Sequence, residues 1–331
     1  MKSTKGLWIF AAAVLALAVL AGGALALWGG GPTREPVPAS TDSASTLETD
    51  PDWGNTVEDG GVTYRLNTDL TTLLFLGTDD GGGDLPGLAP GEGRRADTIL
   101  LLLLDNKTQQ TRLVSVSRDT MTEVEVYNKN GDYAYTTDTH LNMQYYYGDS
   151  SMRSCYLMKK AVSRLLYGIR IDGCLSLTAQ GIVSVVNSMG GLTLTMPEDY
   201  TAIDPRYTKG AALTLTGEEA ERLLRYRDIT VGGSNESRVE RQLRIMETLF
   251  ETLHGKISLS RLEQILEDAG DEIYTDLEAE TLKKLTSYNL DKTTYSLPGT
   301  VVEGEDHDEF HVEDGALRKL LISLFYRPVE D

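Results

Sequence analysis

The most restrictive feature of the sequence is an unbroken run of aliphatic residues, Ile99 to Leu104. A second apolar run, Leu73 to Leu76, precedes it, and the segment from Arg112 to Ser117 alternates between polar and apolar residues. Turn-rich sequence bounds the two continuous runs, which is typical of strands buried on both faces beneath helices. The sequence therefore predicts a β-sheet that is covered by helices.

Helical patterns alternate with strand patterns along the rest of the chain. Helices are predicted over residues 152–166, 179–189, 259–268, 279–288 and 315–326, and strands over 192–196 and 294–297. Two helix starts carry a capping box, in which a hydroxyl residue is followed three positions later by glutamate: Thr216 with Glu219, and Ser237 with Glu240. We therefore expect an α/β fold, an α/β/α sandwich with a central mixed β-sheet.

The N-terminal segment from Gly6 to Trp28 contains no charged residue. As a helix it would be about 34 Å long, which is enough to cross the hydrocarbon core of a bilayer. Lys2 and Lys5 precede it and acidic residues dominate the sequence that follows, so the positive-inside rule places the N-terminus in the cytoplasm. The alternative is a cleaved signal peptide, because Ala24 to Ala26 fits a small-residue cleavage site.

The chain then divides into four parts by composition. We predict a short cytoplasmic tail over residues 1–5, one transmembrane helix over 6–28, a flexible extracytoplasmic stalk over 29–69 and a folded domain over 70–331. Two cysteines fall in the folded domain, Cys155 and Cys174. Outside the cytoplasm they could form a disulfide, and the alternative is two buried thiols.

Polar loops at predicted strand ends are candidates for a binding site. Asp79 follows the first apolar run, Asp97 precedes the second, and a loop over residues 117–120 follows the third strand. Ligands of open α/β folds bind at strand ends, and two carboxylates with phosphate oxygens and water commonly hold Mg²⁺. The alternative is that both aspartates are turn or cap residues. No CxxC or HExxH pattern occurs, which argues against a zinc site.

Six arginines gather in one segment of an acidic protein whose net charge is −19. That net charge argues against a general nucleic-acid binder, which needs a basic face. The six residues are Arg222, Arg225, Arg227, Arg238, Arg241 and Arg244. Arginine binds phosphate with two parallel hydrogen bonds, so the cluster predicts an anion clamp. The alternative is a solvated helix face with salt bridges between neighbouring turns.

Taken together, these pieces resemble the LytR–CpsA–Psr family of cell-wall enzymes. The matching segments are LLFLGTD (73–79), RRADTILLLLLD (94–105), RLVSVSRDT (112–120), HLN (140–142), YGIRIDGCLSL (167–177), VNSMGGLTLTMPEDY (186–200), LTGEEAERLLRYR (215–227) and RVERQ (238–242). Each segment alone is weak, but all of them in this order are specific. Two departures occur: Ser117 stands where the family often has proline, and Thr78 and Asp80 flank Asp79 where the family usually has serine and arginine.

The resemblance implies an enzyme that transfers a glycopolymer, such as a teichoic acid or a capsular polysaccharide, from a polyprenyl-diphosphate carrier to peptidoglycan through a phosphodiester. It implies Mg²⁺ or Mn²⁺ at Asp79 and Asp97. The diphosphate would be bound by a larger set: Arg95, Arg118, Arg225, Arg227, Arg238 and Gln242. Asp79, Asp97, Arg118 and Arg238 would be catalytic. The alternatives are a pyrophosphatase of the same lipid and a non-catalytic binder of anionic wall polymer.

Overall fold

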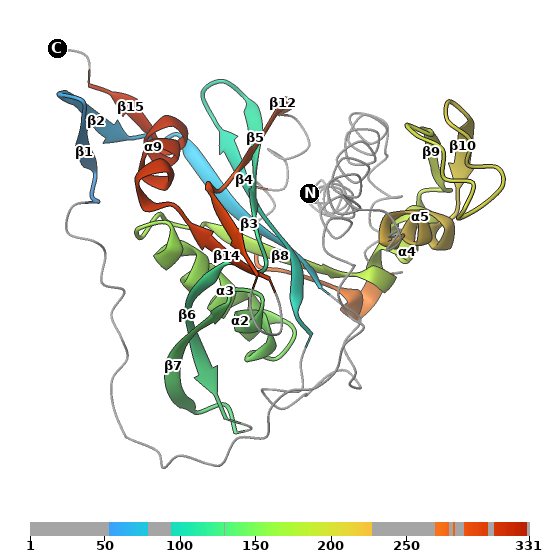
Figure 1. Ribbon diagram of the computed structural model, residues 1–331, viewed down its shortest axis with the longest axis horizontal. Coiled ribbons are helices and arrows are strands. Elements are labelled where there is room, and N and C mark those ends of the chain that lie inside the picture. The colour runs from blue at the N-terminus through green and yellow to red at the C-terminus, as the bar shows by residue number, and fades with distance from the viewer. Residues whose placement is uncertain are drawn as a thin grey trace, which may run out of the picture.

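A mixed six-stranded sheet forms the centre of the molecule, in the order β11-β8-β3-β4-β5-β12 (Figure 1). The computed structural model describes residues 53–78, 94–128, 130–226, 269–277, 281, 288–303 and 308–329. The strands of this sheet are β3 (Leu70–Thr78), β4 (Ala96–Asp105), β5 (Gln110–Val116), β8 (Gly173–Thr178), β11 (Ile273–Thr275) and β12 (Asn289–Ser296). β8 pairs in parallel with β3, and β12 with β5, whereas β4 is antiparallel to both of its neighbours. The predicted mixed sheet is thus confirmed.

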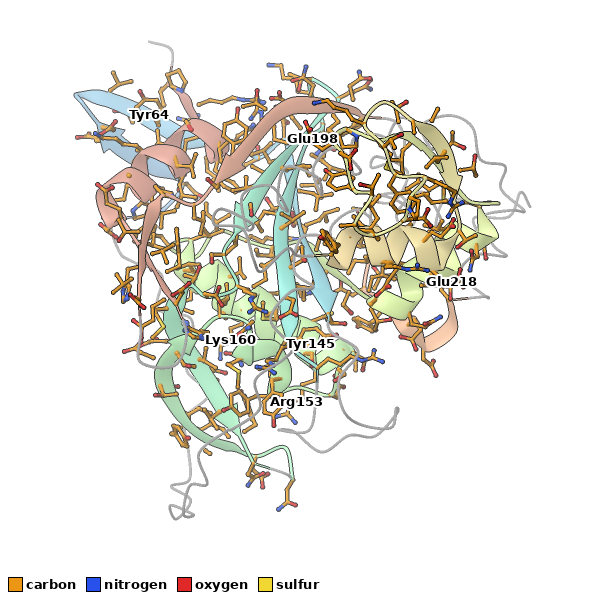
Figure 2. All side chains as sticks on the ribbon, turned by 45° about the vertical axis from the view of Figure 1, so that its right-hand side comes forward. Tyr64, Tyr145, Arg153, Lys160, Glu198 and Glu218 are labelled. Carbon is orange, nitrogen blue, oxygen red and sulfur yellow. The ribbon has the colours of Figure 1, made fainter. Side chains whose placement is uncertain are left out.

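Helices cover both faces of this sheet, as the sequence predicted. One layer contains α2 (Met143–Tyr146), α3 (Met152–Leu165) and α9 (Asp314–Phe325), and the other contains α4 (Ala179–Ser188) and α5 (Gly217–Arg225). Leu101 of β4 packs with the first layer and Leu102 with the second, because successive side chains of a strand point to opposite faces. In Figure 2, Tyr145 of α2 and Lys160 of α3 lie across the sheet from Glu218 of α5.

Four small groups of strands surround the central sheet. They are β1 (Thr56–Asp59) and β2 (Val62–Leu66) with β15 (Tyr326–Pro328), β6 (Met121–Tyr127) with β7 (Tyr133–His140), β9 (Leu192–Thr195) with β10 (Ala212–Leu215), and β13 (Gly299–Val302) with β14 (Glu309–Val312). A 3₁₀ turn, η2 (Gly270–Glu272), leads into β11. All of these pairs are antiparallel.

The group of β1, β2 and β15 corrects the predicted stalk over residues 29–69. Trp53 is only 5% exposed, and its ring stacks on Tyr167 with 5.0 Å between ring centroids. β2 pairs with β15 near the other end of the chain. The folded domain therefore includes residues from Trp53 onward. The prediction was too long because the hairpin is mostly solvent-exposed and has the polar composition of a linker.

Helix α5 packs against α4 and begins at the predicted capping box, which the structure confirms. The Thr216 hydroxyl accepts the N–H of Glu219 at 3.3 Å, and the Glu219 carboxylate accepts the N–H of Thr216 at 2.9 Å. At Gly217 a side chain would place its Cβ 2.3 Å from the carbonyl oxygen of Val183 in α4. Glycine is thus required at the first position of α5. The second predicted capping box, Ser237 with Glu240, lies outside the described residues.

Cys155 of α3 and Cys174 of β8 are free and buried, which is the second of the two predicted alternatives. Burial raises the pKa of the Cys174 thiol well above its ordinary value. The predicted membrane helix over residues 6–28 also lies outside the described residues. Within the part of the chain that is described, no helix is long and apolar enough to span a membrane.

Candidate active site

The ends of several strands meet on one side of the central sheet. We call this row of strand ends the site edge. β3 and β8 run in the same direction, so their last residues Thr78 and Thr178 lie side by side. The first residue of β4, Ala96, pairs with Thr78, and the end of β5 at Val116 pairs with Ile99 of β4. The loop that precedes β4 and the loop that follows β5 therefore both join the sheet at the site edge, as the sequence predicted.

Asp97 is placed at the site edge by a β-bulge. Gly77 pairs with Thr98 and Thr78 pairs with Ala96, which makes Asp97 the extra residue on β4. A bulge bends a strand and redirects the side chain of the extra residue, and bulges are frequent beside active sites. The Asp97 side chain is only 7% exposed, and its Oδ1 lies 2.5 Å from Nη1 of Arg118. The strand end thus carries a nearly buried carboxylate that is bonded to a cation.

Arg118 lies between two carboxylates. Besides the bond from Nη1 to Asp97, its Nε lies 3.3 Å from Oδ1 of Asp119. The Arg118 side chain is 16% exposed, so solvent screens these contacts only weakly. Two predicted site residues are therefore in direct contact, although Asp97 lies on β4 and Arg118 lies in the loop after β5.

The loop that carries Arg118 is held by its own hydrogen bonds. The carbonyl of Ser117 accepts the Thr120 N–H at 3.2 Å and the Thr120 hydroxyl at 2.6 Å. The Ser117 hydroxyl accepts the Asp119 N–H at 3.3 Å, and the Asp119 carbonyl accepts the N–H of Phe310 at 2.9 Å. Ser117, which stands where the resemblance led us to expect proline, thus contributes a side-chain bond to the loop.

Arg94 and Arg95 are adjacent but have different roles in the structure. Arg95 is exposed at the start of β4, which suits a residue that binds a ligand. Arg94 is only 6% exposed, and its guanidinium lies 3.5 Å from Oε2 of Glu272. Glu272 also accepts the hydroxyl of Thr178, the last residue of β8. The sequence did not indicate this ionic support, because Arg94 and Glu272 are far apart in the chain.

Asn142, in the HLN segment, is a second residue whose contacts the sequence did not indicate. Its N–H donates to the carbonyl of Arg118 at 3.1 Å, and the residue is 5% exposed. No donor to its buried side-chain Oδ1 is found among the described residues. A buried acceptor without a donor is uncommon, and a bound ligand or water is one explanation for such a group.

The phenol of Tyr145 supports the site edge from the α2 side. It donates to the carbonyl of Ser150 at 2.9 Å, with the Ser176 hydroxyl 3.1 Å away. The hydroxyl of Ser150 in turn accepts the N–H of Arg94 at 3.1 Å. Burial raises the pKa of Tyr145 well above its ordinary value, so this phenol stays protonated and keeps its donor role.

The remaining predicted site residues cannot be placed at this edge. Asp79, Arg227, Arg238 and Gln242 lie outside the described residues. Arg225 is the last residue of α5, and only its backbone is described. Of the predicted site residues, Arg95, Asp97 and Arg118 are therefore those whose side chains the structure brings to the site edge.

The described residues fit a magnesium site only in part. No group of three or more His, Cys, Asp or Glu side chains in the described part of the chain could hold a metal ion. Mg²⁺, however, is commonly bound by one or two carboxylates together with water and substrate phosphates. Asp97 supplies one such carboxylate, in a nearly buried position where it needs a positive neighbour. The carboxylate of Asp97 thus suits the predicted Mg²⁺ ion.

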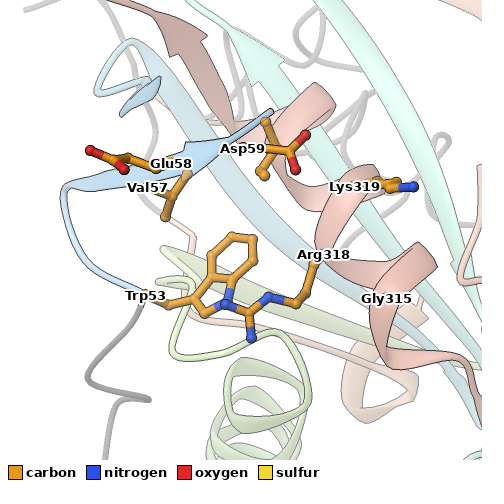
Figure 3. A pocket seen from close by; sticks show the side chains of 8 residues that line it. Trp53, Val57, Glu58, Asp59, Gly315, Arg318 and Lys319 are labelled. Atoms are coloured by element: carbon orange, nitrogen blue, oxygen red, sulfur yellow. The ribbon is translucent and has the colours of Figure 1, made fainter. Parts of the chain in front are cut away.

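A separate pocket of about 370 Å³ lies between β1 and α9 (Figure 3). The Arg318 guanidinium lies 5.3 Å from the ring centre of Trp53 in this pocket. The pocket is lined by Trp53, Val57, Glu58, Asp59, Gly315, Arg318, Lys319 and Ile322. None of these residues belongs to the predicted site, so this pocket is distinct from the site edge.

Comparison with known proteins gives a consistent family match. The model of the LytR_cpsA_psr family matches residues 39–318. A relative from Enterococcus faecalis, named polyisoprenyl-teichoic acid–peptidoglycan teichoic acid transferase TagU, is 27% identical over 219 residues, which are 66% of this chain and 65% of the relative. Biofilm regulatory protein A of Streptococcus mutans is 24% identical over 70% of this chain and 58% of its own length. The chain thus spans somewhat less than two thirds of these relatives.

Solved structures share the same fold at lower sequence identity. The crystal structure of B. subtilis TagU is 19% identical with a TM-score of 0.55, over 80% of this chain and 100% of that one. A structure described as TagT bound to LIIa-WTA is also 19% identical, with a TM-score of 0.55 over 78% of this chain and 90% of that one. At such identities the likeness establishes the mixed α/β fold.

Proposed function

This chain belongs to the LytR_cpsA_psr family, and from that premise we propose that it transfers a glycopolymer from a polyprenyl-diphosphate carrier to peptidoglycan through a phosphodiester. The glycopolymer would be a teichoic acid, a capsular polysaccharide or another wall polysaccharide. The observation that carries the proposal is the contact between Asp97 and Arg118 at the site edge, with Arg95 at the start of the same strand. The names of several relatives, among them the teichoic acid transferase of Enterococcus faecalis, support the same reaction.

The described arginines suit a reaction that breaks a diphosphate. Negative charge grows on the bridging oxygen as polyprenyl phosphate leaves, and fixed positive groups stabilise that charge most effectively where water is excluded. Arg118 is largely shielded from water and Arg95 is exposed, so Arg118 would act near the reacting phosphorus and Arg95 nearer the entrance. Arginine keeps its charge in both settings.

The acidic residues would serve the metal ion and the acceptor. Mg²⁺ or Mn²⁺ bound by Asp97, together with Asp79 outside the described residues, would supply Lewis-acid polarisation of a phosphoryl oxygen. A sugar hydroxyl of peptidoglycan is the proposed nucleophile, and a nearby carboxylate would take its proton. Asp97 and Asp119, which both contact Arg118, are the two candidates for that base.

The proposed location is the outer face of the cell membrane. The uncharged segment over residues 6–28 would anchor the chain, with residues 1–5 in the cytoplasm and the catalytic domain outside. Protease added to intact protoplasts should digest the domain. Full protection of the domain would contradict this topology.

The reaction is tested with the full-length chain in detergent, a polyprenyl-diphosphate glycan, peptidoglycan fragments and Mg²⁺. Polyprenyl phosphate should be released together with a glycan–peptidoglycan phosphodiester, and excess chelator should abolish both products. Release of polyprenyl phosphate without the phosphodiester, across several acceptors, would favour the pyrophosphatase. Glycan binding without any release would favour the non-catalytic binder.

A further inference from the structure

We propose that the pocket between β1 and α9 binds a small zwitterion of the phosphoethanolamine type, in which a phosphate and an ammonium group are joined by a short carbon chain. The phosphate would lie beside Trp53 and Arg318, and the ammonium group near Asp59. The pocket lies apart from the site edge, so the inference does not rest on the proposed transfer reaction. It gives the folded domain a second ligand.

The wall of the pocket contains an unpaired hydrogen-bond donor. Trp53 is 5% exposed, and no acceptor for its indole Nε1–H is found among the described residues. Buried polar groups nearly always have a hydrogen-bond partner, so an unpaired group calls for bound water or a ligand. An indole N–H can only donate, and the partner it lacks is therefore an acceptor. A phosphate oxygen is an acceptor of this kind.

A cation lies beside that donor. The central carbon of the Arg318 guanidinium lies 5.3 Å from the ring centre of Trp53 and 5.5 Å from that of Tyr167. Figure 3 shows the Arg318 side chain pointing from α9 toward the indole. Lys319, the next residue of α9, also lines the pocket and is exposed. Arginine and lysine are the usual partners of phosphate oxygens, so the donor and the two cations together suit a phosphate.

The wall on the β1 side carries the opposite charge. Glu58 and Asp59 of β1 line the pocket and are exposed. In Figure 3 the Asp59 carboxylate points toward α9, whereas the Glu58 carboxylate points away from it. A plain anion would be attracted by the α9 wall and repelled by the β1 wall, whereas a zwitterion finds an opposite charge on each. The charges of the pocket therefore favour a zwitterion.

The pocket has the size and the rigidity of a small-molecule site. Its volume of about 370 Å³ lies within the range of about 300–1,000 Å³ that is usual for such sites. The Trp53 ring is held by stacking on Tyr167 and by an edge contact with Tyr326, so its N–H has a fixed direction. Val57 and Ile322 are buried and add an apolar surface for the carbon chain of the ligand. A preformed site of this kind lowers the cost of ordering side chains on binding.

A water molecule is the simpler explanation for the unpaired donor, since buried waters commonly bond to such groups. In that case Lys319 and Asp59 are ordinary surface charges, and their removal has no effect on the binding of a zwitterion. Binding that depends on both charges thus separates a ligand site from a hydrated cavity.

The experiment titrates the full-length protein in detergent with two soluble probes and measures their affinities by calorimetry. Glycerophosphoethanolamine carries both charges, whereas glycerophosphoglycerol has the phosphate but no ammonium group, so the first probe should bind more tightly. Trp53→Phe, which keeps a ring but removes the N–H, should weaken binding of both probes about 10-fold, as expected for a hydrogen bond to a charged group. Asp59→Asn should weaken only the binding of glycerophosphoethanolamine.

Two lysine variants form a matched pair for this titration. Lys319 lines the pocket, whereas Lys209 pairs with Glu198 at 3.0 Å and does not line it. Lys319→Gln should weaken binding of both probes and Lys209→Gln should change neither, although both remove one positive charge. Because Lys319 is exposed, its variant also serves if Trp53→Phe folds poorly. Equal losses in the two lysine variants would reduce the effect to net charge and overturn the proposal, as would a wild type that binds neither probe or prefers glycerophosphoglycerol.

Fluorescence shows whether the bound probe lies beside Trp53. Trp8→Phe and Trp28→Phe together leave Trp53 as the single tryptophan of the chain. Its emission should change on saturation with glycerophosphoethanolamine. Calorimetric binding without any change in this emission would place the ligand elsewhere and overturn the proposal.

The same single-tryptophan protein distinguishes a lipid headgroup from a free molecule, since both carry the same chemical group. In phosphatidylglycerol vesicles, added glycerophosphoethanolamine should change the Trp53 emission in either case. In phosphatidylethanolamine vesicles it should change the emission if the ligand is a free molecule, and should leave it unchanged if lipid headgroups already fill the pocket. No response in either kind of vesicle would overturn the proposal.

Discussion

The two ends of strand β4 each carry a buried aspartate that contacts an arginine, but the two carboxylates are held in different ways. At the end of the strand, Oδ1 of Asp105 accepts the backbone N–H groups of Lys107 and Thr108, both at 2.9 Å. Its Oδ2 accepts Nη2 of Arg327 at 3.1 Å. At the start of the strand, Asp97 is bonded to the long side chain of Arg118.

This difference teaches which buried charges can take part in chemistry. Backbone N–H groups in a turn cannot leave without breaking the turn, so Asp105 is a permanent part of the fold. The partner described for Asp97 is an arginine side chain, which can rotate without any change of the backbone. The side chains of Asp97 and Asp105 are about equally buried, and the nature of the partner distinguishes the structural carboxylate Asp105 from Asp97, to which we propose a function.

The largest expected effect is on turnover, which should distinguish Asp97 from Asp105. Asp97→Asn should lower glycan transfer by about 100-fold or more, because it removes a charge from the reacting site. Asp105→Asn should keep turnover close to the wild-type value. Both are measured as release of polyprenyl phosphate at saturating Mg²⁺. Equal losses of turnover in the two variants would remove the distinction between the ends of β4.

The next largest effect should distinguish Arg95 from its neighbour Arg94, through diphosphate binding and thermal stability. Arg95→Ala should weaken diphosphate binding by about 1.5–3 kcal/mol, the usual range for a hydrogen bond to a charged group, and should leave the thermal midpoint unchanged. Arg94→Ala should lower the thermal midpoint, since it leaves the Glu272 carboxylate without the buried guanidinium. Titration with methylenediphosphonate, a diphosphate that cannot be hydrolysed, and thermal unfolding measure the two quantities. Weaker diphosphate binding by Arg94→Ala, together with a lower thermal midpoint for Arg95→Ala, would show instead that Arg94 binds the ligand.

The smallest expected effect concerns the pH dependence of stability at Asp105. Burial raises the pKa of this carboxyl, but the N–H groups of Thr108 and Lys107 and the Arg327 guanidinium more than offset it, so the pKa lies below the ordinary value of 3.8. A lowered pKa in the folded state stabilises the protein above the unfolded-state pKa, and this stabilisation is lost as pH falls through the folded-state pKa. Asp105→Asn should therefore cost about 1–2 kcal/mol near neutral pH.

Unfolding of the wild type and Asp105→Asn from pH 7 down to pH 3 measures this difference. The difference in the free energy of unfolding between the two proteins should be constant near neutral pH. It should narrow only at the acidic end of the series. A gap that already narrows between pH 7 and pH 5 would point to a different titrating group.

The sequence predicted the central sheet and its helices because their hydrophobic patterns are local. The apolar run at Ile99–Leu104 and the capping box at Thr216 act within a few residues, and both features are present in the structure. The bulge at Asp97 could not be predicted, because it depends on how β3 and β4 align. The burial of Arg94 depends on Glu272, which is 178 positions away.

For the candidate site, the sequence indicated residue types but not their arrangement. Asp97 and Arg118 were both chosen from the sequence, but nothing in the local pattern indicated that they contact each other. The donor-free amide oxygen of Asn142 was invisible for the same reason, since burial and partners are properties of the folded chain. Strand-end loops therefore indicate which residues to consider, and long-range pairing decides which of them are in contact.

If the segment over residues 6–28 anchors the chain in the membrane, as we propose, the aromatic packing at Trp53 has a mechanical consequence. Tension on the tether enters the folded domain at Trp53, whose ring lies 5.0 Å from that of Tyr167 and 5.5 Å from that of Tyr326. β2 then passes the load to β15, near the opposite end of the chain. Under that anchor, the first contacts to bear a pull on the N-terminus would be the aromatic packing of Trp53 and this small sheet, ahead of the central sheet.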